Sequence, residues 1–68
     1  MLDNILEVIK TVNESYKAYT VGVVFRNSTF SWYENTNKVE LVGNTLIIHS
    51  EGVYEFPIQE IMGLTLVD

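Results

Sequence analysis

The segment His49 to Phe56, HSEGVYEF, carries the residues best suited to acid–base chemistry. His49 is the single histidine of the chain, and Glu51 and Glu55 lie close to it. An imidazole can act as a general base when a carboxylate orients it, but it also needs a pocket and a reacting group. Ser50 would project from the opposite strand face. We therefore interpret His49 as a surface residue in an acidic patch, with an enzyme centred on His49 and Glu55 as a minor alternative.

Glu40 and Glu55 form a second candidate pair, because both flank Ile47 on adjacent predicted strands. Paired carboxylates serve as acid and base in glycoside hydrolysis. The sequence indicates no sugar-binding cleft around them, so we interpret both as charges on a solvated sheet face. We expect no catalytic residue and no small-molecule substrate.

Metal and nucleotide sites are also disfavoured. The chain has no cysteine and one histidine, which argues against structural zinc. Its glycines are isolated, so no glycine-rich phosphate-binding loop is present. We expect no cofactor and no metal.

The charge balance argues against nucleic acid and anionic membranes as partners. The formal net charge is −5, and the four basic residues do not cluster. Affinity for nucleic acid depends largely on Lys and Arg neutralising phosphates. Phe30 and Trp32 could stack on bases, but Glu34 lies beside them, and we assign both rings to the core.

The elements that position these residues follow from hydrophobic periodicity. Apolar residues recur at helical spacing over residues 2–18, at Leu2, Ile5, Leu6, Ile9, Val12 and Tyr16. Asn4 and Glu7 have the spacing of a capping pair. Alternating patterns then predict strands at about 19–26, 29–34, 38–42, 45–49, 53–57 and 63–67, with a helical turn over 57–61. We expect residues 1–68 to form a single domain.

Three turns set the predicted strand registers. A two-residue turn at Asn27-Ser28 would pair Phe25 with Phe30 on the core face. Gly43-Asn44 suits a second tight turn. At the third turn we predict a three-residue loop of Ser50, Glu51 and a left-handed Gly52. This loop places the apolar residues of strand 53–57 on the same face as those of strand 45–49, whereas a two-residue turn would not.

The predicted fold class is α+β, with an N-terminal helix packed on an antiparallel five- to six-stranded meander sheet or a small Sm/SH3-like barrel. We expect no signal peptide and no membrane span, and a cytoplasmic location. The Asn, Thr, Ile and Lys content suits an AT-rich bacterial or phage genome.

An apolar patch on the outer sheet face is the most informative feature for function, since such patches often mark interfaces. We expect a small acidic protein–protein interaction module that binds a protein partner, forms a homo-oligomer, or does both. One version is an inhibitor or accessory subunit whose carboxylates imitate phosphates. The expected interaction residues are Val24, Tyr33, Glu40, Val42, Ile47, His49, Val53 and Glu55.

The order of elements, with VYEFPIQEIMGLTLV passing through a helical turn into a closing strand, resembles the Sm-like fold. This resemblance implies an oligomeric ring that binds RNA, which is our alternative function. The RNA-binding motifs of that family are not matched. YENTNKVEL lacks the spacing of the Asp and Asn that hold the base, and HSEGVYEF is acidic where a basic element is expected.

Overall fold

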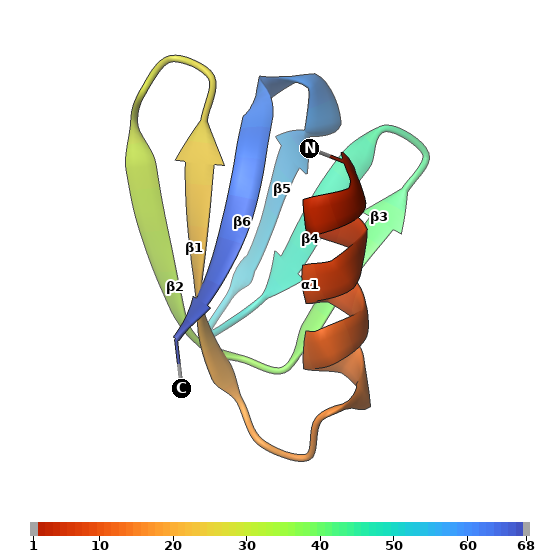
Figure 1. Cartoon of the computed structure of the whole chain (residues 1–68). Helices are drawn as coiled ribbons and strands as arrows, with labels where there is room; N and C mark the ends of the chain where they lie inside the picture. Colours follow the sequence, from red (N-terminus) through yellow and green to blue (C-terminus); the bar gives the residue numbers. More distant parts are fainter. Residues whose placement is uncertain (1, 68) are drawn as a thin grey trace.

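The computed structural model describes residues 2–67, with side chains from Asn4 onward. One helix precedes six strands and a short 3-10 helix (Figure 1). In chain order these elements are α1 (Leu2–Glu14), β1 (Tyr19–Phe25), β2 (Phe30–Thr36), β3 (Lys38–Val42), β4 (Thr45–His49), β5 (Val53–Pro57), η1 (Ile58–Glu60) and β6 (Ile61–Val67).

The strands form two three-stranded antiparallel sheets, ordered β2-β1-β6 and β3-β4-β5. Only Asn37 separates β2 from β3, so the chain passes directly from one sheet into the other. Helix α1 packs against β6 and β3, each of which is an outer strand of its sheet (Figure 1). The α+β class with antiparallel sheets is therefore confirmed. None of the described helices is long and apolar enough to cross a membrane.

Helix α1 ends at Glu14, four residues before the predicted end. Ser15 N–H donates to Val12 O at 3.3 Å, a tightened final turn, and Ser15 Oγ then accepts from Lys17 N–H at 3.1 Å. Tyr16, assigned to the apolar stripe, is fully exposed beyond this end. The side chain of Leu2, another member of that stripe, lies outside the described residues.

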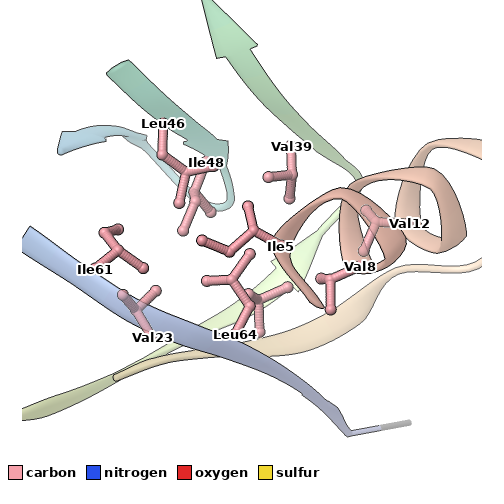
Figure 2. Packing of buried hydrophobic residues seen from close by; sticks show 10 residues of the cluster. Ile5, Val8, Val12, Val23, Val39, Leu46, Ile48, Ile61 and Leu64 are labelled. Carbon is pink, nitrogen blue, oxygen red and sulfur yellow. The ribbon is translucent and has the colours of Figure 1, made fainter. Parts of the chain in front are cut away.

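The core lies between the helix and the two sheets (Figure 2). Helix α1 contributes Ile5, Val8 and Val12, whereas Leu6 is about half exposed. Strand residues complete the buried set, namely Val21, Val23, Val39, Leu46, Ile48, Ile61 and Leu64. Val8, which the predicted stripe did not include, is thus buried, and Ile9 is partly buried against the core.

Two asparagines attach α1 to the edges of both sheets. Asn13 Nδ2 donates to Val39 O at 2.8 Å, and Asn13 Oδ1 accepts from Val39 N–H at 2.9 Å. Asn4 Oδ1 accepts from Leu64 N–H at 2.9 Å. Asn4 lies inside the helix, so its predicted capping role with Glu7 was wrong.

The predicted registers of β3, β4 and β5 are confirmed. Val39 pairs with Ile48 and Leu41 with Leu46, and β5 continues the same face with Tyr54 opposite Ile48. Gly43 has the positive φ that the tight turn requires, at 60°. The loop of residues 50–52 is present, but Gly52 is not left-handed as predicted.

The β1–β2 hairpin differs from prediction by one residue. Val24, not Phe25, pairs with Phe30, and Gly22 pairs with Trp32. Ser28 adopts φ 72°, and its N–H donates to Phe25 O, which makes a three-residue loop. A shift of one residue exchanges the two faces of a strand. Phe30 and Trp32 therefore lie on the outer face, and their assignment to the core was wrong.

Candidate interaction surfaces

Six of the eight predicted interaction residues share the outer face of the β3-β4-β5 sheet. Glu40, Ile47 and Glu55 lie side by side across the three strands. Val42 lies beyond this row at one end of the sheet. His49 and Val53 pair beyond it at the other end. We call this surface the β4 face; it comprises Lys38, Glu40, Val42, Thr45, Ile47, His49, Val53, Glu55 and Pro57.

Apolar side chains are open to solvent on the β4 face. Val42 is 57% exposed and Val53 61%, while Ile47 between them is half-buried. Val42 and Val53 lie at opposite corners, and Glu40 and Glu55 flank Ile47 on either side. The apolar residues Val42, Ile47 and Val53 thus run diagonally across the face with carboxylates beside them. This arrangement suits contact with another protein surface.

A hydrogen-bonded pair occupies one side of the β4 face. His49 Nε2 lies 2.6 Å from Glu40 Oε2, and Lys38 Nζ lies 3.8 Å from Glu40 Oε1. The hydrogen bond with His49 is the main cause that lowers the pKa of Glu40, and the positive charge of Lys38 acts in the same direction. His49 therefore has Glu40 as its partner. Glu55 lies directly opposite Ile47 and so is diagonal to His49, as the predicted register requires.

The other two predicted interaction residues lie away from the β4 face. Val24 is on the outer face of the β2-β1-β6 sheet, paired with Phe30 and Gly63. Tyr33 is half-buried against the core, with its ring centroid 4.7 Å from that of Tyr54 and 5.8 Å from that of Phe56. The expectation that Tyr33 faces outward was wrong, because the hairpin shift turns it inward.

Sequence reasoning missed an aromatic surface on the β2-β1-β6 sheet. Phe30 is 46% exposed and Trp32 50%, and their rings meet edge to face with centroids 4.7 Å apart. A Cβ on Gly22 would lie 2.7 Å from Trp32 Cζ3 and 3.0 Å from Phe30 Cζ. Gly22 therefore provides the space for both rings, and a glycine within a valine-rich strand was the signal available in the sequence.

Two of the cavities lie beside the β1–β2 hairpin. One, of about 280 Å³, is lined by Trp32, Tyr33, Glu34, Ser50, Glu51 and Tyr54. Asn35 Nδ2 donates to Glu51 Oε2 at 2.9 Å and so positions one of the two carboxylates that line this cavity. The other cavity, of about 200 Å³, lies beside Arg26, whose Nε donates to Gln59 O at 2.8 Å. Within residues 4–67, no three His, Asp or Glu side chains gather in a way that could hold a metal ion.

No protein-family model, curated protein or solved structure matches this chain.

Proposed function

We propose that this chain is a small, non-catalytic protein–protein interaction module that binds a partner through the β4 face. The observation that carries the proposal is the arrangement of Val42, Ile47 and Val53 on one face of the sheet, with carboxylates on both sides of Ile47. A valine that is more than half exposed gains free energy when a partner removes it from water. Two such valines on one face of a 68-residue chain favour docking over chance exposure.

The charges of the β4 face define the partner's chemistry. Glu40 and Glu55 lie on either side of Ile47, Lys38 lies beside Glu40, and the whole chain carries a net charge of −5. The complementary surface is an apolar centre with Lys or Arg around it. A nucleic-acid-binding groove supplies such Lys and Arg side chains, so an inhibitor or accessory subunit that occupies a groove of this kind is the version of this function that the charge favours.

The fold that presents the β4 face is, in our proposal, a small barrel. The chain runs from β2 into β3 with one residue between them. At the opposite end, Arg26 N–H donates to Glu60 O and Ile58 N–H donates to Asn44 O, which ties η1 to both sheets. These contacts support one continuous curved sheet, in which the β4 face is held rigidly before a partner arrives.

Affinity capture with matched variants tests the proposed function. Tagged wild-type protein, Val42→Asp/Val53→Asp and the control Val24→Asp/Val67→Asp are incubated with extract of the source cell, with and without nuclease. The control changes two valines on the other sheet, of which Val67 is 48% exposed. Circular dichroism first establishes that all three proteins fold.

We expect a protein that survives nuclease and binds wild type and control, but is lost with Val42→Asp/Val53→Asp. Retention of the partner by this variant would contradict the β4 face as the binding surface. Recovery of RNA that nuclease removes would favour the Sm-like alternative instead. If the partner is a nucleic-acid-binding protein, its capture should weaken steeply as salt rises, because the attraction is between opposite charges.

A further inference from the structure

We propose that a second copy of this chain pairs with the free edge of β2, so that two β2-β1-β6 sheets join across a two-fold axis. This contact uses the opposite sheet from the β4 face. It goes beyond the proposed function, and either proposal can fail without the other.

The two sheets have four outer strands, β2, β6, β3 and β5, and side chains of α1 lie on two of these edges. An unprotected edge presents backbone groups to any other strand. Asn4 occupies the edge of β6 at Leu64, and Asn13 binds both backbone groups of Val39 on the edge of β3. On the edge of β5, Pro57 has no N–H to donate, which interrupts pairing at that end of the strand.

The first half of β2 has no such protection. Phe25 N–H donates to Thr29 O at 3.0 Å, and the backbone groups of an antiparallel strand alternate in direction. Ser31 and Tyr33 therefore direct their backbone groups toward β1, while Phe30 and Trp32 direct theirs to the open side. Figure 1 shows β2 at the outer side of its sheet with β1 as its strand neighbour.

The second half of β2 is covered by the β4–β5 loop. Ser50 Oγ donates to Glu34 O, and the ring of Tyr33 lies against that of Tyr54. The open stretch is thus Phe30 to Tyr33. It is long enough for a short antiparallel pairing centred on Ser31.

This stretch is complementary to itself. With Ser31 on the two-fold axis, Phe30 lies opposite Trp32 of the second copy, and the open N–H and C=O groups of each satisfy those of the other. The rings of Phe30 and Trp32 lie on one outer face in each copy, edge to face. Pairing would bring four half-exposed rings together, and aromatic pairs across strands stabilise sheets.

The charges along the open stretch of β2 are compatible with a second copy as the occupant. In this register Glu34 lies opposite Ser28 of the second copy, in the loop that carries Arg26. Glu34 and Glu51 line the cavity of about 280 Å³ at that end of β2. The Arg26 side chain is directed toward η1, where its Nε donates to Gln59 O. The pairing therefore sets no like charges directly opposite one another along the paired stretch.

A single cysteine tests this register directly. The chain has no cysteine, so Ser31→Cys introduces one thiol. Opposite residues at a non-hydrogen-bonded antiparallel position have Cα atoms about 4.5 Å apart, within the span of a disulfide. We expect Ser31→Cys to form a covalent dimer on mild oxidation, while the control Val42→Cys, on the β4 face, stays monomeric under the same conditions.

Sedimentation of the untagged protein from about 10 µM to about 1 mM provides the second measurement. We expect wild type to dimerise over this range, with a parallel change in the fluorescence of Trp32, the single tryptophan. Phe30→Lys/Trp32→Lys places four cations around the axis and should be monomeric. Val42→Lys/Val53→Lys makes the same charge change on the β4 face and should still dimerise.

A wild-type protein that stays monomeric up to about 1 mM would overturn the proposal. The proposal would also be overturned if Phe30→Lys/Trp32→Lys still dimerised while Val42→Lys/Val53→Lys was monomeric. If the double lysine variant does not fold, the Ser31→Cys crosslink decides. Absence of a covalent Ser31→Cys dimer, in a sample that sediments as a dimer, would place the contact elsewhere.

Discussion

Asn13 holds Val39 by both backbone groups, with Asn13 Nδ2 donating to Val39 O at 2.8 Å and Val39 N–H donating to Asn13 Oδ1 at 2.9 Å. The two residues are 26 positions apart in the chain. One amide side chain thus replaces the missing neighbour strand at the edge of β3 and fixes the helix against the sheet.

Replacing Asn13 should therefore destabilise the fold. Asn13→Ala removes two hydrogen bonds and leaves part-buried groups of Val39 without partners, so we expect a loss of about 1–3 kcal/mol in the free energy of unfolding. Urea denaturation measures it. Glu14→Ala, at the adjacent exposed position, is the control and should stay within about 0.5 kcal/mol of wild type. Equal effects of the two changes would contradict this role of Asn13.

Gly22→Ala should disturb the aromatic surface. The new methyl group would lie 2.7 Å from Trp32 Cζ3 and from Thr65 Cγ2, so the rings must move. We expect a cost of about 1–3 kcal/mol and a changed Trp32 emission spectrum. Gly52→Ala is the matched control, because its nearest contact would be an ordinary 3.4 Å. An unchanged spectrum in folded Gly22→Ala would show that the rings do not depend on this glycine.

Ser28→Gly should stabilise the β1–β2 hairpin. Ser28 has φ 72°, a conformation that costs a residue with a Cβ about 1–2 kcal/mol and that glycine adopts freely. Part of this gain is offset by the larger entropy of glycine in the unfolded chain, so we expect a net gain of about 0.5–1 kcal/mol. Thermal unfolding measures it. Thr29→Gly, beside the left-handed position, should destabilise, and a gain there too would contradict the explanation.

The pair of His49 and Glu40 should give stability that depends on pH. The pKa of Glu40 in the folded chain lies below its ordinary value of 4.5, mainly because of the hydrogen bond with His49. The contribution of Glu40 is therefore fully present above pH 4.5 and is lost as the pH falls through the lowered pKa. His49→Ala should raise the pKa of Glu40, measured by NMR titration of its carboxyl carbon.

Lys38→Met is the comparison for that titration. Its charge is a weaker cause of the lowered pKa than the hydrogen bond of His49, so it should raise the pKa of Glu40 less than His49→Ala does. A larger effect of Lys38→Met would mean that charge rather than the hydrogen bond governs Glu40.

The sheet β3-β4-β5 was predictable because its turns contain residues with clear preferences. Gly43 with Asn44 set one register, and agreement of apolar faces set the next. The β1–β2 hairpin was not predictable in the same way. Valines at 21, 23 and 24 allow an apolar match in either register, and a left-handed serine is not a turn signal. Because the predicted register was wrong by one residue, the exposed surface of Phe30 and Trp32 was not predicted either.

The helix shows a similar limit. Its periodic pattern continues to Tyr16, but Ser15 binds the local backbone and the helix ends at Glu14. The contacts of Asn4 and Asn13 with strands 60 and 26 positions away depend on tertiary structure, so local sequence rules could not indicate them. On the β4 face, strand alternation was sufficient to bring Glu40, Ile47 and Glu55 together.

The most direct test of the central claim is a footprint of the captured partner on isotopically labelled protein, by NMR or by hydrogen exchange. Our account predicts that the partner changes amide signals along β3, β4 and β5, centred on Ile47, and leaves α1 unchanged. Changes confined to α1 or to the β2-β1-β6 sheet, with Ile47 and its neighbours unaffected, would contradict it.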